Sequence, residues 1–436
     1  MSIATTDLAG LVQPAKGTVS RQVYVDQGIY DHELERIFTR SWLFLGHTSQ
    51  LAQPGDFVTT YMGEDPVIVA RGKDGQVRAM LNSCRHRGMR VCRSDEGNTS
   101  FFRCPYHAWT YSNTGELTGV PKFRLGYGGV LDKKEWGLLE VPRVEEYGGF
   151  LFGNWDAGAV PLTEWLGDFR LYFDLVFGRD PEGVEFVGGV HKWSVSSNWK
   201  IPTENFACDM YHVAHSHARS MEIGLLGPSG DDGYEIAAGM GFLGNGFGPP
   251  ASADAEGAPV HPMATMATPY SEHLAAQRAR VAERYSQEMS RVVPGGHGNV
   301  FPNFAFLDIE LLRLVRVHHP EGPGCHTVHQ WCVVDKSLPA EVKDALRRQY
   351  TLTFGPSGML EQDDGENFRE CQASMRGVIG RRMENNLMLG LGQDRTGAEI
   401  VGDGDAPGAG GGIWSEANQR RWYEHWLSFM TGQVRR

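Results

Sequence analysis

Two short cysteine–histidine pairs constrain this chain more than any other feature of its sequence. The pairs are Cys84-x-His86 and Cys104-x2-His107, and each follows a short run that is typical of a strand. Two thiolates and two imidazoles suit a [2Fe–2S] cluster in which the cysteines hold one iron and the histidines hold the other. Structural zinc also accepts two cysteines and two histidines, but zinc modules usually pair like with like. The mixed pairs therefore favour the iron–sulfur cluster, with zinc as the alternative.

A second set of candidate metal ligands lies further along the chain, in residues 198–217. This segment predicts a helix that begins near Pro202, and on such a helix Asp209 and His212 share a face. Two imidazoles and a carboxylate on one side of Fe(II) leave the opposite positions open for O2, as non-haem oxygenases require. The carboxylate is available in the acidic run at residues 361–367. Each of these residues alone is more often a polar core residue, so the prediction depends on their combination.

Together, these motifs resemble the large (α) subunit of Rieske non-haem iron aromatic-ring-hydroxylating oxygenases, the naphthalene and biphenyl dioxygenase group. The resemblance covers nearly the whole chain, and both motifs occur in the order and spacing of the family. In that family the first motif holds a Rieske [2Fe–2S] cluster and the second holds a mononuclear non-haem Fe(II). The resemblance implies the cluster ligands Cys84, His86, Cys104 and His107 and the iron ligands His212, His217 and Asp364.

Two of these iron ligands have a close rival in the sequence. His215 is an additional histidine within the segment, and helical spacing alone favours it. The family has four residues between its two histidines, which selects His217. In the Glu-x-Asp-Asp run of the family the second aspartate binds iron, which selects Asp364 over Asp363.

Asp209 is expected to serve electron transfer rather than to bind iron. In the family its counterpart joins a cluster-ligating histidine of one subunit to an iron-ligating histidine of the next, across a trimer interface. The resemblance thus implies a route from His107 of a neighbouring copy through Asp209 to His212. Metal-bound histidines usually donate their second ring N–H to such a carboxylate. A local cap or ion pair is the alternative for Asp209, and Asn205 is expected to lie near the iron.

The second cluster loop departs from the family pattern at one position. Ala108 follows His107, where glycine is frequent in the family. An alanine is compatible with this loop if its φ is negative, because only glycine adopts positive φ without a steric cost.

The positions that match the substrate pocket of the family are mostly apolar. They are Phe206, Met210, Val213, Phe354 and Leu360. Apolar walls suit a neutral aromatic ring, because such pockets bind chiefly by burial with few polar anchors. An aromatic carboxylate would instead require a buried arginine, and Arg313 and Arg316 on a predicted strand are the candidates.

The resemblance implies a terminal oxygenase that uses O2 and NADH-derived electrons to cis-dihydroxylate an aromatic ring. The chain has one literal dinucleotide fingerprint, Gly239–Gly244, but Pro249 and Pro250 follow it and exclude the helix that would bind pyrophosphate. We therefore expect the electrons to come from a separate NADH-dependent reductase through a ferredoxin. As in the family, we also expect a small β subunit in an α3β3 assembly.

Other functions remain as alternatives to this prediction. Within the enzyme class, they are dioxygenation or monooxygenation of a benzoate-, phthalate- or salicylate-type carboxylate. Outside it, they are a pure electron-transfer Rieske protein, which would leave most of the chain without a purpose, and a zinc-stabilised binding module without chemistry.

The pattern along the chain predicts an α+β protein with two domains. Residues 41–157 carry short apolar runs between turns, which is typical of a small β domain. Residues 1–40 and 158–436 are expected to form the catalytic domain, which in the family is an antiparallel sheet covered by helices. Two stretches rich in glycine, 244–262 and 402–412, are predicted to be loops, and the first is a candidate entrance lid.

Four further elements are predicted within the catalytic domain. Residues 269–292 and 339–352 favour helices, because they have periodic apolar positions and no internal glycine or proline. Residues 315–319 and 327–334 favour two neighbouring strands joined by a turn rich in glycine and proline.

Composition indicates a protein of the reducing cytoplasm. The seven cysteines lack the spacing of a disulfide framework. The first residues lack a signal peptide, and no apolar run is long enough to cross a membrane. The net charge of -12, without a basic stripe, argues against nucleic acids and anionic membranes as partners.

Overall fold

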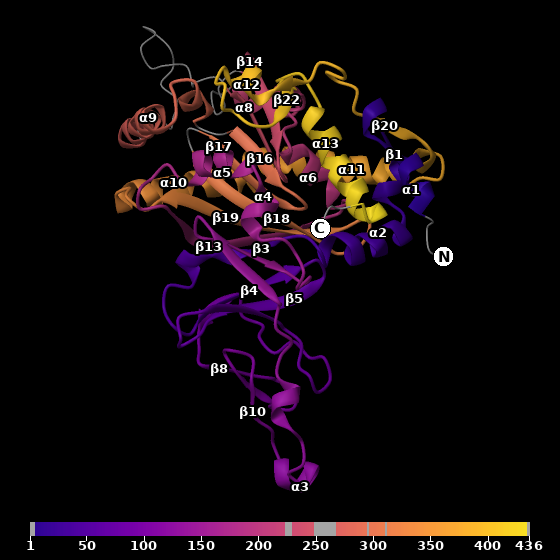
Figure 1. Cartoon of the computed structure of the whole chain (residues 1–436), viewed down its shortest axis with the longest axis vertical. Helices are drawn as coiled ribbons and strands as arrows, with labels where there is room; N and C mark the ends of the chain where they lie inside the picture. The colour runs from indigo at the N-terminus through magenta and orange to yellow at the C-terminus, as the bar shows by residue number, and fades with distance from the viewer. Residues whose placement is uncertain (1–4, 223–228, 248–266, 294–295, 310–311, 434–436) are drawn as a thin grey trace. The chain divides into compact units, whose positions relative to one another are not determined.

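The computed structural model describes residues 5–222, 229–247, 267–293, 296–309 and 312–433 (Figure 1). Its contacts divide the chain into two compact units. The smaller unit comprises residues 38–162, and the larger one joins residues 1–37 to residues 163–436. The division into a small β unit and a larger unit of helices and sheet confirms the predicted α+β class.

The smaller unit consists of short antiparallel strands and carries both cysteine–histidine pairs. Its strands are β3 (Leu43–His47), β4 (Asp56–Met62), β5 (Asp65–Arg71), β6 (Val77–Leu81), β7 (Glu96–Asn98), β8 (Phe101–Arg103), β9 (Thr110–Ser112), β10 (Leu117–Gly119), β11 (Arg143–Tyr147) and β12 (Phe150–Asn154). They form three sheets in the orders β6-β5-β4-β7, β11-β12-β3 and β10-β9-β8. Val67 to Ala70 of β5 are all buried, because side chains on both faces of this inner strand contribute to the core.

The larger unit contains a nine-stranded antiparallel sheet, which confirms the predicted architecture of the catalytic part. In sheet order its strands are β13 (Val184–Val195), β19 (His326–Asp335), β18 (Leu312–Pro320), β17 (Phe304–Ile309), β16 (Gly296–Val300), β15 (Gly241–Phe247), β14 (Ser229–Ala238), β22 (Ala409–Gly412) and β21 (Arg395–Thr396). The predicted strands at 315–319 and 327–334 lie within β18 and β19, which pair with each other.

Helices pack against this sheet and position the candidate site. They are α6 (Lys200–Phe206), α9 (Ala267–Arg284), α10 (Ala340–Phe354), α11 (Met359–Met375) and α13 (Ala417–Thr431) (Figure 1). Helix α6 contacts β16 and β17, while α10 contacts β18 and β19. The helix predicted over 269–292 is shorter than expected: α9 ends at Arg284, and Met289–Val292 forms a separate 3-10 turn.

A buried carboxylate ties the start of the chain to two of these helices. Glu33, at the end of α2 (Gln27–Glu33), is fully buried. It accepts hydrogen bonds from Trp199 Nε1 at 2.9 Å, Lys200 Nζ at 2.6 Å and Trp426 Nε1 at 2.7 Å. Since a buried charge is costly unless it is paired and hydrogen-bonded, this cluster holds α2, α6 and α13 in one arrangement.

The prediction that residues 402–412 form a loop was wrong for their last part. Ala409–Gly412 is strand β22, which pairs with β14 and β21. Glycine is required there because a Cβ on Gly410 would lie 1.9 Å from the carbonyl oxygen of Glu235. A glycine-rich segment can thus be a strand where another backbone approaches closely.

The other glycine-rich stretch is described only in part. Residues 244–247 belong to β15 rather than to a loop, and residues 248–262 of the predicted lid lie outside the described part of the chain. The fingerprint Gly239–Gly244 forms the turn between β14 and β15 and the start of β15. No helix among the described residues is long and apolar enough to cross a membrane.

Candidate active site

The two cysteine–histidine pairs lie in loops of the same backbone design. In the first loop the N–H of Cys84 donates to the carbonyl of Met89 at 2.9 Å, and the N–H of Gly88 donates to the carbonyl of Cys84 at 2.8 Å. The second loop repeats both bonds around Cys104, at 2.8 Å and 3.0 Å. The shared design places the two cysteines at equivalent positions, while His86 follows its cysteine by two residues and His107 by three.

The four side chains of these loops fit a Rieske cluster. The Nδ1 atoms of His86 and His107 lie 3.1 Å apart, so that one iron can accept both. The thiols of Cys84 and Cys104 are buried, and burial together with the neighbouring Cys84 thiol raises the pKa of Cys104. Tyr111 Oη lies 3.3 Å from Cys84 Sγ, which adds the hydrogen bond to sulfur that tunes such clusters.

An alanine at position 108 would be unstrained only with a negative φ, and the structure has a positive one. Its φ is +56°, in the left-handed region, which costs an L-residue about 1–2 kcal/mol. The equivalent position of the first loop is Gly88, where φ is +71° and glycine carries no such cost. The second loop therefore retains a strain that the first loop avoids.

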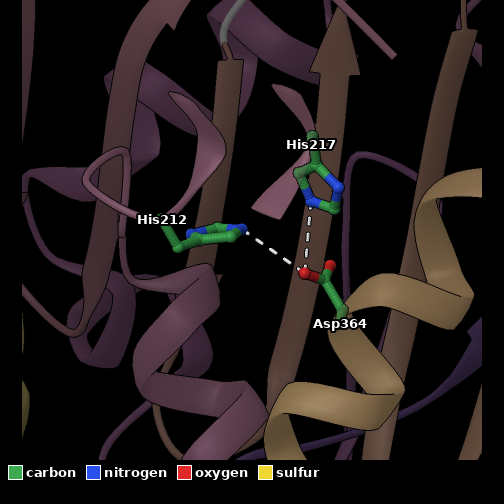
Figure 2. Close-up of side chains that lie close together, drawn as sticks. All are labelled: His212, His217 and Asp364. Atoms are coloured by element: carbon green, nitrogen blue, oxygen red, sulfur yellow. Dashed lines mark ion pairs between the residues drawn. The ribbon is translucent and has the colours of Figure 1, made fainter. Parts of the chain in front are cut away.

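His212, His217 and Asp364 meet in the larger unit (Figure 2). Oδ1 of Asp364 lies 3.4 Å from Nε2 of His212 and 3.2 Å from Nε2 of His217. This oxygen is buried and accepts no hydrogen bond from the described residues. Adjacent ligands at about 2.1 Å from an octahedral ion lie about 3 Å apart, so the three atoms have the spacing of one face of such a site.

The helix that was predicted to carry both histidines is broken, and this part of the prediction was wrong. Helix α6 ends at Phe206, and the chain turns at Cys208, whose φ is +103°. His212 precedes and His217 follows the short helix α7 (Val213–Ser216). The turn fits because Gly244 has no side chain: a Cβ there would lie 1.7 Å from Cys208 Sγ. The break directs both imidazoles toward α11, which carries Asp364.

The electrostatics of this site favour a cation. Burial lowers the pKa of His212, but the nearby carboxylates of Asp209 and Asp364 outweigh it and raise this pKa to about 10. Burial raises the pKa of Asp364, while its contacts with His212 and His217 hold that pKa well below the usual range. The carboxylates thus attract a positive charge to the point where the imidazoles meet.

A surrounding layer of polar groups orients His212. Oδ2 of Asp209 lies 3.4 Å from Nδ1 of His212, and Oδ1 of Asp209 accepts a hydrogen bond from the His212 backbone N–H at 3.2 Å. Nδ2 of Asn205 lies 3.2 Å from the same Nδ1. The structure therefore places both predicted residues beside the ring nitrogen that faces away from Asp364.

The two rival residues lie outside the three-atom cluster. Asp363 directs Oδ2 at Nδ1 of His217, at 3.3 Å, on the far side of the ring from Asp364. His215 instead lies against Tyr211, with the ring centres 6.1 Å apart. The contact of Asp363 was missed at the sequence level, although adjacent carboxylates commonly divide into a metal ligand and a partner of the ligand histidine.

The five predicted pocket residues belong to one buried apolar cluster. Phe206, Met210, Val213, Phe354 and Leu360 pack there. Leu307 and Leu314 of the sheet belong to the same cluster. Apolar side chains therefore adjoin the His212 site.

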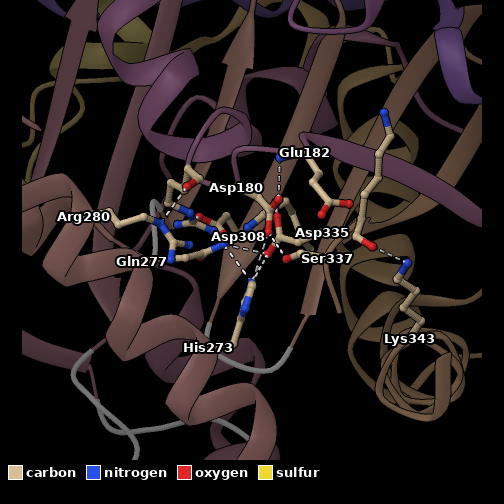
Figure 3. Close-up of polar contacts among 12 residues, drawn as sticks. Asp180, Glu182, His273, Gln277, Arg280, Asp308, Asp335, Ser337 and Lys343 are labelled. Carbon is tan, nitrogen blue, oxygen red and sulfur yellow. Dashed lines mark hydrogen bonds and ion pairs between the residues drawn. The ribbon is translucent and has the colours of Figure 1, made fainter. Parts of the chain in front are cut away.

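Neither candidate arginine offers a free guanidinium. Arg316 lies over the ring of Phe206, with Cζ 4.6 Å from its centre, and it binds both carboxylate oxygens of Glu361, at 2.6 Å and 3.3 Å. Arg313 binds Asp308 at 3.1 Å and Asp335 at 2.9 Å. These two aspartates belong to the network of Figure 3.

The two centres together define a class of protein, the Rieske non-haem iron oxygenases. The thiolate–imidazole set of the small unit suits the electron-transfer cluster. Two histidines and a carboxylate with open positions are the facial triad of non-haem Fe(II) oxygenases.

Comparison with known proteins identifies the family. Residues 41–127 match the Rieske [2Fe–2S] domain, and residues 182–432 match the ring hydroxylating alpha subunit (catalytic domain). The chain is 38% identical to the alpha subunit of biphenyl dioxygenase from Metapseudomonas furukawaii over 97% of this chain and 93% of that one. It is 40% identical to the alpha subunit of benzene 1,2-dioxygenase from Pseudomonas putida over 98% and 94%. The structure of naphthalene 1,2-dioxygenase from Rhodococcus sp. with bound indole superposes with a TM-score of 0.81 at 34% identity, covering 99% of this chain and 97% of that one.

The chain belongs to the family of ring-hydroxylating dioxygenase alpha subunits. Its cofactors are a Rieske [2Fe–2S] cluster and a mononuclear non-haem iron. The zinc alternative is thereby wrong, and so is a pure electron-transfer role.

Proposed function

We propose that this chain is the terminal oxygenase subunit of a multicomponent enzyme that cis-dihydroxylates a neutral aromatic ring. The observation that carries the proposal is the meeting of His212, His217 and Asp364 beside a buried apolar cluster. A facial triad leaves positions open for O2, and an apolar wall binds an uncharged ring by burial. The matched relatives bear the names of biphenyl and benzene dioxygenases, which supports this substrate class.

In this proposal the ligands are the residues whose donor atoms converge. Cys84, His86, Cys104 and His107 hold the cluster, and His212, His217 and Asp364 hold the iron. When bound, the two groups supply single-electron transfer and O2 activation. The protein contributes the orientation of the ligands and the exclusion of water from the ring.

Asp209 and Asp363 select which ring nitrogen of His212 and of His217 carries the proton. Oδ2 of Asp209, 3.4 Å from Nδ1 of His212, can accept a hydrogen bond from an N–H at that nitrogen, which leaves the lone pair of Nε2 toward Asp364. Asp363 does the same for His217, at 3.3 Å. Both imidazoles are thereby oriented with Nε2 toward Asp364, and a bound metal would take the place of a proton on Nε2.

The proposal favours a neutral substrate over a carboxylate. A substrate carboxylate requires a guanidinium that is not already neutralised. Arg316 is engaged by Glu361 on both oxygens, and Arg313 is engaged by Asp308 and Asp335. An anionic substrate would meet guanidinium groups whose positive charge is already balanced by buried carboxylates.

The partners of the chain follow from the same proposal. Asp209 is 35% exposed at its side chain even though it contacts His212, so a second residue can reach it. We propose that His107 of a neighbouring copy is this residue, in a trimer completed by small β subunits. A ferredoxin and an NADH-dependent reductase supply the electrons, and the protein acts in the cytoplasm.

Product analysis under oxygen-18 gas tests the proposed reaction. Cells that express this chain with a β subunit, a ferredoxin and a reductase are fed naphthalene, biphenyl, benzoate, phthalate and salicylate. We expect a neutral cis-dihydrodiol that carries two labelled oxygens. An Asp364→Ala variant, which loses one of the three converging donors, should give no labelled product and keep the Rieske absorbance.

Other product patterns would contradict specific parts of the proposal. A singly labelled phenol would mean monooxygenation rather than dihydroxylation. Labelled product from the carboxylated substrates alone would mean that Arg316 exchanges Glu361 for the substrate. An Asp209→Asn variant that keeps full turnover would exclude the electron route through Asp209.

A further inference from the structure

Two buried histidines, His318 and His326, lie on the face of the sheet against which Phe206 of helix α6 packs. Residues two apart on a strand share a face, and so do residues directly opposite on neighbouring strands. His318 follows Arg316 by two positions on β18, and His326 of β19 pairs with Pro320, two positions after His318. The ring centres of His318 and His326 are 5.3 Å apart, and that of His318 is 6.0 Å from Phe206.

This face adjoins the iron site through α6. Phe206 ends that helix, and the residue before it, Asn205, lies 3.2 Å from the His212 ring. The ring of Phe206 contacts His318 and packs in one apolar cluster with Val213, the residue that follows His212. A ring system that packs along Phe206 can reach both sites.

The hydrogen-bonding state of His326 is determined by its neighbour. Its Nδ1 lies 2.8 Å from the carbonyl oxygen of Ser197, which only accepts, so Nδ1 carries the proton. Burial lowers the pKa of His326 to about 4, so the ring is neutral. Its Nε2 is then a bare acceptor, and it is buried without a donor among the described residues.

His318 has no side-chain hydrogen bond among the described residues. It is 0% exposed, and neither Nδ1 nor Nε2 has a partner. Burial, together with the nearby His326 and Arg316, holds its pKa well below the usual range, so it is neutral. A neutral imidazole offers one donor and one acceptor, and both of these are available here.

Unpaired polar groups of this kind are rare in protein cores. A buried polar group without a partner costs free energy, and most buried polar groups are therefore satisfied. Asn299 on β16, which β17 separates from β18, is also 0% exposed, and neither of its amide atoms has a partner among the described residues. Several such groups on one face, beside a catalytic centre, are typical of a surface that binds a polar part of a ligand.

We propose that His318 and His326 form a subsite for a hydroxyl group on the aromatic substrate, at a position remote from the bond that is oxidised. The proposal rests on the proposed ring-hydroxylating function and narrows its substrate class to hydroxylated aromatics. The hydroxyl donates its proton to Nε2 of His326 and accepts a hydrogen bond from the N–H of His318. One oxygen at about 2.8 Å from each nitrogen spans two rings whose centres are 5.3 Å apart.

Other substituents fit the pair less well. A carboxylate only accepts hydrogen bonds, so it would oppose the lone pair on Nε2 of His326 and would face two neutral rings. A plain hydrocarbon would leave Nε2 of His326 and both nitrogens of His318 unpaired. A hydroxyl is neutral and both donates and accepts, which matches the pair.

The test compares biphenyl with its three monohydroxylated forms in the reconstituted enzyme. We expect kcat/KM for at least one hydroxybiphenyl to exceed that for biphenyl by about tenfold or more, because a buried site built for a hydroxyl rejects the analogue that lacks it. A His318→Leu variant should lose this preference, because it removes the donor that the substrate hydroxyl requires. A His326→Asn variant, which keeps a donor near the Ser197 carbonyl but lacks Nε2, should also lose it.

His319→Leu is the matched control. His319 is a buried imidazole of the same strand whose side chain lies on the opposite face, where its ring is 4.5 Å from that of His329. This variant should keep the preference for the hydroxylated ring. If His318→Leu does not fold, His318→Gln replaces it and should retain part of the preference through its terminal amide.

Two outcomes would overturn the subsite. One is a wild-type enzyme with no preference among the four substrates, and the other is a preference that survives both His318→Leu and His326→Asn. The labelled-oxygen count is a separate readout. Product with one labelled oxygen would contradict dihydroxylation, while a selectivity ratio that collapses in the histidine variants would still support the subsite.

Discussion

The strained loop at Ala108 makes a quantitative prediction about the Rieske unit. The two cluster loops have the same backbone bonds, yet one has glycine and the other alanine at the left-handed position, with φ of +71° at Gly88 and +56° at Ala108. An L-residue loses about 1–2 kcal/mol there. Glycine gives back about 0.5–1 kcal/mol through the greater freedom of its unfolded chain. Ala108→Gly should therefore stabilise the cluster-bound unit by about 1 kcal/mol.

The reciprocal substitution, Gly88→Ala, is the matched control. A Cβ at Gly88 would find its nearest neighbouring atom, Ser83 Oγ, at 3.9 Å, so no clash adds to the backbone cost. The variant should lose about 1 kcal/mol. The two variants should thus differ by about 2 kcal/mol, which is about 30-fold in the equilibrium of cluster loss.

Denaturant titration of the assembled protein, followed by the visible absorbance and circular dichroism of the cluster, measures both variants. We expect the two midpoints to move in opposite directions from the wild type, with an unchanged slope. Shifts in the same direction would refute the reasoning, because they would mean that the side chains rather than the backbone angles decide the stability of the loops. A common midpoint for all three proteins would refute it equally.

Three further substitutions test other contacts. Asp363→Asn removes the carboxylate that faces Nδ1 of His217 at 3.3 Å, so iron affinity should fall about 10- to 100-fold; an unchanged iron titration would contradict that role. Tyr111→Phe removes the hydroxyl 3.3 Å from Cys84 Sγ, so voltammetry should find a lower cluster potential, and an equal or higher one would exclude this hydrogen bond. Burial opposes ionisation of Asp335, but two buried arginines outweigh it and hold its pKa well below the usual range. The ionised Asp335 carboxylate therefore stabilises the folded state fully above about pH 4, and this contribution is lost as the pH falls through its folded-state pKa. Asp335→Asn should lower the free energy of unfolding by about 3–5 kcal/mol at pH 7. The difference in denaturant midpoint between this variant and the wild type should become smaller below about pH 4. A difference that does not change with pH would contradict this role of Asp335.

The features that the sequence predicted well are those that local pattern determines. Strands β18 and β19 are rich in β-branched and other apolar residues and flank a turn rich in glycine and proline, and both the strands and their pairing were expected. The structure brings His217, and not His215, together with His212 and Asp364. In that case the spacing in a family motif carried information that helical periodicity did not.

The features that could not be predicted depend on contacts between distant segments. The break after α6 requires Cys208 to turn with positive φ, and it is possible only because Gly244 of another strand leaves room for the thiol. Strand β22 was taken for a loop because its glycines have poor strand propensity, and its pairing with β14 decides otherwise. The partner of the His217 ring, Asp363, is adjacent to Asp364 in sequence, and only the helix orientation separates their roles.

The broken helix also bears on how this protein matures. His212 and His217 flank α7, whereas Asp364 lies on α11, and β14 to β19 come between them in the chain. An ion held by all three residues therefore closes a long loop, in the same sense as a disulfide, and it restricts the unfolded chain accordingly. Because strands β14 to β19 separate the donors along the chain, we expect the site to be assembled late in folding. Iron should be acquired by a nearly finished domain, and its removal should loosen α7 and α11 while most of the sheet remains intact.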